Sequence, residues 1–170
     1  MEKGLTHTIY TVKVLEGHTD ANVDRLAQIL LQNASNRLSN DPSHTNFEDS
    51  FCPNHPVIDK IVDDMQEVYP HGRLSLDDKW GHIHEKNMSS NRHDHANFDL
   101  SGVVYLQVPK GCGQIVFWPN PIHEYRYTIP PKKGLFLLFP GWVPHCVTRN
   151  LSSEPRVSIS MNFNVNLEES

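Results

Sequence analysis

The pattern of hydrophobic and polar positions divides the chain into a helical part and a strand-rich part. Residues 8–15 are rich in β-branched side chains and predict an opening strand. From about Thr19 the period changes to that of an amphipathic helix, with Thr19 or Asp20 available as its N-cap. The apolar face of this helix would consist of Val23, Leu26, Ala27, Leu30, Leu31 and Ala34.

A loop and a second helix follow. Residues 35–53 carry Ser, Asn, Asp, Pro and His without a period, which is typical of a loop. Asn54 or His55 can then cap a helix that has Pro56 in its first turn and ends before the Pro-His-Gly segment 70–72. Its buried stripe would consist of Ile58, Ile61, Val62, Met65 and Tyr69.

Beyond Trp80 the pattern favours short strands separated by turns that contain Pro and Gly. The strands are predicted at about 79–85, 91–96, 102–108, 114–118, 125–129, 134–139, 145–149 and 156–165. Such a set predicts a mainly β fold, a small sandwich or barrel of the jelly-roll type, with the two helices packed on one outer face. We expect one domain over 1–170, in which 1–78 form the helical support with the opening strand and 79–166 the barrel core.

Composition narrows the class of protein. A chain of 170 residues suits one domain with a real core, and its formal net charge of −5 gives no electrostatic footprint for nucleic acid or an anionic membrane. The odd number of cysteines, three, argues against a disulfide scaffold and favours a reducing compartment. No apolar run approaches the roughly 20 residues that a membrane span needs. The expectation is a cytoplasmic protein with neither a nucleic-acid nor a membrane partner.

Three histidines are candidate metal ligands. His93 and His95 would lie on one face of an extended strand, because strand side chains alternate with period two. His145, on a distant strand, can close on the same ion only if the sheet rolls up. Three imidazoles would suit iron, nickel, copper or zinc and would leave coordination positions open. The alternative is that His93 and His95 are exposed loop histidines and that His145 is a hydrogen-bonded core residue.

The strand after Arg156 has one apolar and one polar face. Its polar face begins with Arg156 and Ser158, which could bind the carboxylate of an organic acid inside the barrel. Tyr105 has the parity of the candidate ligands and could add a phenolic hydrogen bond, or it is an ordinary strand aromatic. The competing interpretation is that the polar face meets water and that Arg156 makes a weak surface ion pair.

A second His-x-His pair, His82 and His84, follows Trp80. No histidine on another strand obviously completes a ligand set with this pair. We therefore interpret His84 as a possible pocket residue and not as a ligand.

From Trp80 to Phe163 the chain resembles the 2-oxoglutarate/iron(II)-dependent oxygenases of the prolyl-hydroxylase-like superfamily, in particular a small group of phage and bacterial proteins. The resemblance lies in the order and spacing of several short segments. The matching pieces are Trp80-Gly-His-Ile-His, His93-x-His95 with Ser101-Gly-Val-Val-Tyr-Leu, Gly113-Gln-Ile-Val-Phe-Trp-Pro-Asn-Pro, Gly134-Leu-Phe-Leu-Leu-Phe-Pro, His145, and Arg156-Val-Ser-Ile-Ser-Met-Asn.

The resemblance implies a double-stranded β-helix, a jelly-roll barrel with Fe(II) at its mouth. It implies that His93 and His145 ligate the iron, that Arg156 pairs with the distal carboxylate of 2-oxoglutarate, and that Ser158 assists. Such enzymes use 2-oxoglutarate and O2 as co-substrates, release succinate, and hydroxylate a C–H bond of a second substrate, which is a peptide residue or a small metabolite.

The chain departs from the superfamily at the second ligand. The wider group has His-x-Asp or His-x-Glu where this chain has His93-Asp94-His95. Asp94 would point to the opposite face of a regular strand, so His95 is the preferred second ligand. A bulge could bring in Asp94, or Asp99 could reach the metal from the following loop. A neutral histidine leaves the iron more positive than a carboxylate would.

Two rival classes of function fit part of the pattern. Cupins also combine His-x-His, a following acid and a third histidine, here His93, His95, Asp99 and His145, and would act as isomerases or as oxygenases without 2-oxoglutarate. The second rival class is a barrel that binds a ligand without a metal. Arg156 and Ser158 favour the 2-oxoglutarate enzyme, because a cupin does not need them. The loops expected to select the second substrate are 35–53, 86–92 and 119–126.

Overall fold

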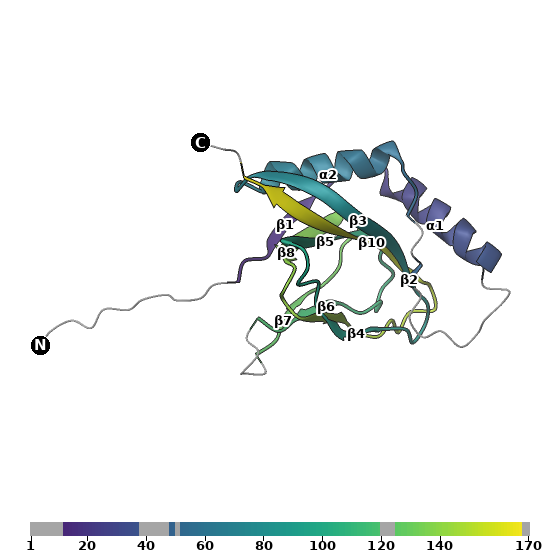
Figure 1. Cartoon of the computed structure of the whole chain (residues 1–170). Helices are drawn as coiled ribbons and strands as arrows, with labels where there is room; N and C mark the ends of the chain where they lie inside the picture. The colour runs from purple at the N-terminus through teal and green to yellow at the C-terminus, as the bar shows by residue number, and fades with distance from the viewer. Residues whose placement is uncertain (1–11, 38–47, 50–51, 120–124, 168–170) are drawn as a thin grey trace, which may run out of the picture.

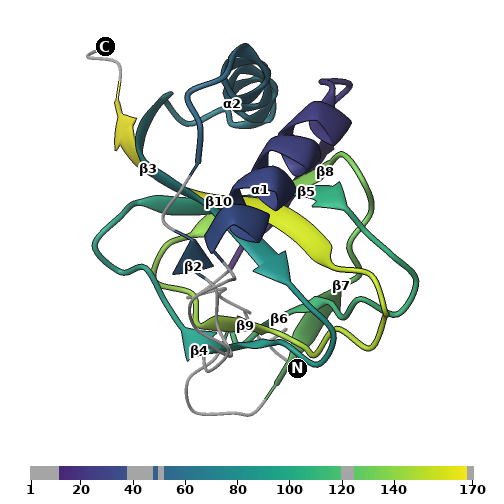
Figure 2. The same ribbon diagram turned by 90° about the vertical axis from the view of Figure 1, so that its right-hand side faces the viewer.

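Two antiparallel sheets face each other, and two helices cover the outer side of the larger sheet (Figures 1 and 2). The structure is a computed structural model that describes residues 12–37, 48–49, 52–119 and 125–167. The helices are α1 (Val23–Arg37) and α2 (Pro56–Val68). Neither is long and apolar enough to cross a membrane, and the same holds for every helix in the described part of the chain.

The larger sheet has six strands. In spatial order they are β1 (Leu15–His18), β8 (Leu135–Pro140), β5 (Leu100–Gln107), β10 (Arg156–Asn166), β3 (Arg73–His84) and β2 (Glu48–Asp49). The smaller sheet has four, in the order β4 (Ser90–His93), β9 (His145–Val147), β6 (Ile115–Phe117) and β7 (Tyr127–Ile129). Both helices lie on the far side of the larger sheet from the smaller one (Figure 1).

This arrangement confirms the predicted mainly β class with two helices on one outer face. The eight predicted strands correspond to β3–β10. Of the predicted opening strand at 8–15, residues 8–11 lie outside the described residues, 12–14 are not in a strand, and β1 begins at Leu15. β3 begins at Arg73, earlier than predicted, because its first half pairs with the far end of the long strand β10.

The helix caps were predicted correctly for α2 only. His55 caps α2, its ring nitrogen accepting a hydrogen bond from the backbone N–H of Val57. For α1 the predicted cap is wrong, because the side-chain oxygen of Asn22 accepts from the N–H of Arg25. Thr19 instead donates its hydroxyl to the buried carboxylate of Asp64 in α2, at 2.5 Å, and so connects the segment before α1 to α2.

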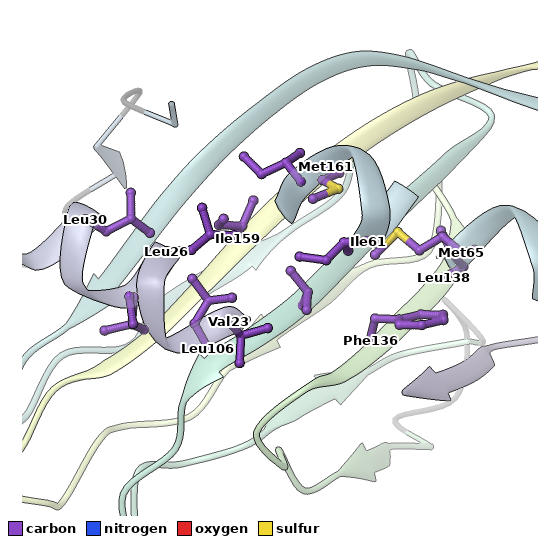
Figure 3. Close-up of a cluster of buried hydrophobic side chains, with 14 of the residues drawn as sticks. Val23, Leu26, Leu30, Ile61, Met65, Leu106, Phe136, Leu138, Ile159 and Met161 are labelled. Atoms are coloured by element: carbon purple, nitrogen blue, oxygen red, sulfur yellow. The ribbon is translucent and has the colours of Figure 1, made fainter. Parts of the chain in front are cut away.

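A hydrophobic core fills the space between the helices and the larger sheet (Figure 3). Leu26 of α1 and Ile61 of α2 are fully buried in it. The sheet contributes the apolar face of β10, which was predicted from its alternation: Val157, Ile159, Met161 and Phe163. Each fully buried side chain of this size stabilises the fold by roughly 1.5–3 kcal/mol, so this face anchors β10. The opposite face of β10 therefore points between the two sheets.

Candidate metal centre

Three histidines converge at one end of the space between the sheets. His93 of β4 and His145 of β9 lie directly opposite each other in the smaller sheet. His95 follows in the next turn, where its backbone N–H donates to the carbonyl of Gly141 at 2.7 Å. One ligand atom from each of the three side chains lies within 4.8 Å of the others. Among the described His, Cys, Asp and Glu side chains, these three form the group that could hold one metal ion.

Hydrogen bonds to the backbone set the tautomers of two of these rings. Nδ1 of His93 lies 2.7 Å from the carbonyl oxygen of Asn91, and Nδ1 of His145 lies 2.9 Å from that of Val143. A carbonyl oxygen only accepts, so Nδ1 carries the hydrogen in both rings. Nε2 is then left with its lone pair, which is the form of imidazole that binds a metal.

The two carboxylates considered as alternative ligands make other contacts. Asp94 accepts a hydrogen bond from the backbone N–H of Ala96, and Asp99 accepts one from Val165 at the far end of β10. Neither belongs to the group of close ligand atoms within the described residues.

The pocket beside the three histidines is lined mainly by the inner faces of β3, β5 and β10. In register, His84 lies opposite Arg156 on β10, and Trp80 opposite Ser160. The rest of its wall includes apolar side chains from both sheets, among them Val103, Ile115, Phe139 and Val147. The polar face of β10 thus faces the interior of the sandwich, as predicted, and not bulk water.

Arg156 is a buried cation without an anionic partner among the described residues. The residue is 1% exposed. One of its guanidinium nitrogens, Nη1, donates a hydrogen bond to the carbonyl of Cys112 at 2.9 Å. Nε and Nη2 have no hydrogen-bond partner among the described residues. Burial lowers the pKa of Arg156 from its ordinary value. An unpaired buried charge is costly, so these two free N–H groups indicate a site for an anion.

Tyr105 and Ser158 have different relations to this pocket. Tyr105 lines it, is 2% exposed, and its hydroxyl has no hydrogen-bond partner in the described part of the chain. Burial raises the pKa of Tyr105, so the phenol stays a hydrogen-bond donor. Ser158 is buried between Tyr105 of β5 and His82 of β3 in register but is not among the residues that line the pocket.

Burial also keeps His82 and His145 neutral. It lowers the pKa of His145 to about 4, and that of His82 to about 3 with a further contribution from the charge of Arg156. His82 lines the same pocket as Arg156 and the three candidate ligands. Neutral imidazole is the form that a metal site requires.

Sequence reasoning found His84 but missed His82, Trp80 and Ser90, all of which line the pocket. Trp80 packs against His95, with ring centroids 5.5 Å apart. The alternation of β3 could have shown that Trp80 and His82 share the face of His84. Ser90 had no such signal, because β4 changes register between Ser90 and His93. Of the loops expected to select the substrate, 38–47, 50–51 and 120–124 lie outside the described residues.

The arrangement can hold a divalent cation next to an organic anion. The three imidazoles supply a facial set of nitrogen ligands with room for other ligands on the ion. The free N–H groups of Arg156 and the hydroxyl of Tyr105 can bind a carboxylate in the same pocket. Both Fe(II) and a 2-oxo diacid therefore fit the residues present.

The structure thus combines a β-sandwich with a histidine group that could hold a metal ion and a buried arginine between the sheets. Residues 78–162 match the family described as "Putative 2OG-Fe(II) oxygenase". The chain belongs to this family, whose members are oxidoreductases that use Fe(II) and 2-oxoglutarate.

Solved structures share the fold at low sequence identity. A prolyl-4-hydroxylase of Pseudomonas putida is 17% identical, with a TM-score of 0.63 over 92% of this chain and 94% of that one. The viral collagen prolyl hydroxylase of Paramecium Bursaria Chlorella virus-1 is 19% identical, with a TM-score of 0.62 over 88% and 96%. The alpha ketoglutarate dependent epimerase SnoN from nogalamycin biosynthesis is 16% identical, with a TM-score of 0.62 over 88% and 76%. No curated protein matches the chain.

Proposed function

We propose that this chain is a non-haem Fe(II)/2-oxoglutarate-dependent dioxygenase that hydroxylates a C–H bond of a second substrate. The observation that carries the proposal is the buried guanidinium of Arg156, with two free N–H groups, in the pocket that the three histidines also line. A metal-binding barrel that did not bind an organic acid would have no use for this unpaired cation.

His93, His95 and His145 are the proposed metal ligands. The backbone acceptors at Asn91 and Val143 hold the rings of His93 and His145, so that each presents Nε2. Bound iron would supply the redox chemistry that couples decarboxylation of the oxo acid to oxidation of the second substrate. The protein contributes a neutral ligand set and an apolar wall, including Val103 and Phe139, that limits water around the reacting groups.

Arg156 is the proposed partner of the distal carboxylate of 2-oxoglutarate. Its Nε and Nη2 can donate two parallel hydrogen bonds, which fixes both the position and the direction of the acid. Tyr105 adds a phenolic donor from the neighbouring strand. Ser158 lies between His82 and Tyr105 in register and does not line the pocket, so its proposed role is to assist by positioning these neighbours.

Hydroxylation is favoured over other outcomes by two of the similar structures, both of prolyl hydroxylases. An epimerase has the same fold, so the fold alone does not fix the reaction. The second substrate of the proposed reaction is a peptide residue or a small metabolite.

The proposal is tested by adding Fe(II) to purified protein without oxygen and then adding 2-oxoglutarate. A weak visible charge-transfer band should appear only after the second addition, because it arises when the oxo acid chelates the iron. Iron binding without such a band would contradict the proposal and would favour a cupin-type protein that works without 2-oxoglutarate.

A matched pair of variants tests the role of Arg156. Arg156→Ala should weaken 2-oxoglutarate binding at least about 30-fold, since two charge-assisted hydrogen bonds are lost, and should leave iron uptake intact. Arg149→Ala removes an exposed arginine and should change neither. Unchanged affinity in Arg156→Ala would remove this residue from the site.

A further inference from the structure

His84 is a buried polar side chain to which neither the metal centre nor the guanidinium site assigns a role. The residue is 5% exposed, lines the pocket, and lies directly opposite Arg156 across the β3–β10 pair. Side chains at directly opposed positions of an antiparallel pair have Cβ atoms about 5 Å apart. His84 is therefore within reach of whatever the guanidinium of Arg156 binds.

The hydrogen bonds of the His84 ring are incomplete. Nε2 lies 2.9 Å from the hydroxyl oxygen of Ser90, while Nδ1 has no partner among the described residues. Within this pocket the other unpartnered polar atoms are Nε and Nη2 of Arg156 and the hydroxyl of Tyr105. Four buried polar atoms from three residues of one pocket thus lack a partner. Such atoms are rare in native proteins and point to a missing ligand.

The backbone holds His84 and Arg156 in fixed relation. Asn150, which is fully buried, donates from its side chain to the carbonyl of His84 at 2.8 Å and to that of Glu154 at 2.9 Å. Gln107 donates to the carbonyl of Pro155, the residue before Arg156, at 2.8 Å. The end of β3 and the start of β10 are clamped together, so the two side chains form a preorganised pair.

We propose that His84 is a further binding residue for the diacid, and that its Nδ1–H donates a hydrogen bond to the carboxylate that Arg156 pairs with. This inference rests on the proposed function, since it names a new contact of the same co-substrate. In this contact the hydroxyl of Ser90, 2.9 Å away, would donate to Nε2, which would leave the hydrogen on Nδ1. Ser90 belongs to β4, the strand that also carries His93, so the contact links the acid site to the metal strand.

The number of donors matches the acceptor. A carboxylate has about four lone-pair positions, and the pocket offers four donor atoms: Nε and Nη2 of Arg156, the hydroxyl oxygen of Tyr105 and, in the proposed tautomer, Nδ1 of His84. Burial and the neighbouring charge of Arg156 lower the pKa of His84 to about 2, so the ring is neutral and does not repel the guanidinium. With the opposite tautomer, the lone pair of Nδ1 would face the carboxylate and oppose its binding.

The test compares two oxo acids that differ only at the distal end. Iron-loaded protein without oxygen is titrated with 2-oxoglutarate and with 2-oxovalerate, which has a methyl group in place of the distal carboxylate. His84→Phe should weaken binding of 2-oxoglutarate about 10-fold, the loss expected for one hydrogen bond to a charged group, and should leave binding of 2-oxovalerate and iron unchanged. Equal weakening of both acids would indicate a merely structural role and would overturn the inference.

His84→Asn provides the conservative control. An asparagine amide can place an N–H close to the position of Nδ1, so this variant should bind 2-oxoglutarate within about 3-fold of the unsubstituted protein. Nitrogen NMR of the ring in the 2-oxoglutarate complex, prepared with a diamagnetic metal such as Zn(II), should show the hydrogen on Nδ1. A hydrogen on Nε2 in that complex would contradict the proposed contact.

The two proposals fail in different ways. If the unsubstituted protein binds no 2-oxoglutarate, the oxygenase function fails and the role of His84 fails with it. If the protein binds 2-oxoglutarate and Arg156→Ala weakens it, but His84→Phe binds it as tightly as the unsubstituted protein, only the role of His84 is wrong.

Discussion

Single residues of the candidate site are held by bonds to the backbone. His93 and His145 each donate Nδ1–H to a carbonyl two residues earlier in the chain. The same short local contact recurs on both strands, and the ring of Phe139 also packs edge-on against that of His145, with centroids 4.9 Å apart. Such outer contacts typically change metal affinity 10–100-fold, which makes the orientation of the rings part of the affinity of the site.

Removing one ring should abolish stoichiometric metal loading. His145→Ala takes away one of three nitrogen ligands, and the affinity for Fe(II) should fall by more than the roughly 100-fold upper effect of an outer contact. Titration with Fe(II) or Co(II) without oxygen, followed by metal analysis, measures this loss. His71→Ala, at an exposed histidine, is the matched control. A His145→Ala protein that retains a full equivalent of metal would show that the ligand set is different.

The buried neutral histidines also predict how stability depends on pH. The pKa values of His84, His82 and His145 in the folded protein, about 2, about 3 and about 4, lie below the ordinary value of 6.5. Below about pH 6.5 the unfolded chain therefore binds more protons than the folded one, and acid favours unfolding. The metal-free protein should lose stability as the pH falls from 6.5 toward 4, by up to about 1.4 kcal/mol per pH unit for each group.

Urea unfolding of the metal-free protein at pH 7.5, 5.5 and 4.5 measures this dependence. His84→Asn removes one of these three groups, so the stability of this variant should fall less steeply as the pH is lowered. If the metal-free protein became more stable as the pH falls from 6.5 to 4.5, the assignment of neutral buried rings would be wrong.

Among the elements, β10 organises the molecule because its two faces have different tasks. Its apolar face packs under the helices, while its polar face, beginning with Arg156, faces the pocket. Helix α1 matters to the site only through this strand and its neighbours. Damage to the helical layer should therefore lower the stability of the fold without changing the chemistry of the metal centre.

Leu26→Ala tests this separation. Leu26 is fully buried between α1 and the larger sheet, so truncation should cost about 2–5 kcal/mol of unfolding free energy, as for other buried leucines. Gln28→Ala, one residue beyond Ala27 on the exposed side of α1, should change stability by less than about 0.5 kcal/mol. Denaturant unfolding measures both. The affinity for metal, measured well below the unfolding transition, should be the same in the two variants.

Local periodicity explains which elements were predictable. The helical spacing of α1 and α2 and the alternation of β10 are properties of neighbouring residues, and all three were predicted from the sequence. β2 has two residues and exists through its pairing with β3, which no local pattern encodes. The N-cap of α1 was mispredicted because the hydroxyl of Thr19 donates to the carboxylate of Asp64 in α2, which is 45 positions away in the sequence.

In the candidate site, too, local patterns were predictable from the sequence and long-range contacts were not. Strand parity paired His93 with His95 and placed Arg156 with Ser158 on one face, and His145 was added as a third imidazole on a distant strand. In the structure β4 ends at His93, so His95 reaches the group from the following turn and not by strand parity. Asp94 accepts its hydrogen bond within a turn, and Asp99 accepts one from the far end of β10. The sequence does not encode these contacts locally, so both residues remained possible metal ligands in the sequence analysis. The cross-strand register that sets His84 opposite Arg156 required the structure.

At the scale of the whole molecule, the site lies between two sheets. The smaller sheet supplies His93 and His145, whereas the larger sheet supplies Arg156 and Tyr105. A metal chelated by a diacid whose far end binds Arg156 would connect the two sheets through the pocket. The ligands should then act as a structural link as well as reactants.

This link predicts a stepwise rise in stability. Metal alone should stabilise the protein, and metal with 2-oxoglutarate at about 100 times its dissociation constant should add about 2.7 kcal/mol of unfolding free energy by mass action. Equilibrium unfolding without oxygen measures the two increments, and hydrogen exchange should slow in β4 and β9 because opening of the smaller sheet must break the link. In Arg156→Ala the metal increment should persist and most of the 2-oxoglutarate increment should vanish. A full 2-oxoglutarate increment in that variant would mean that the acid binds the metal without reaching the larger sheet.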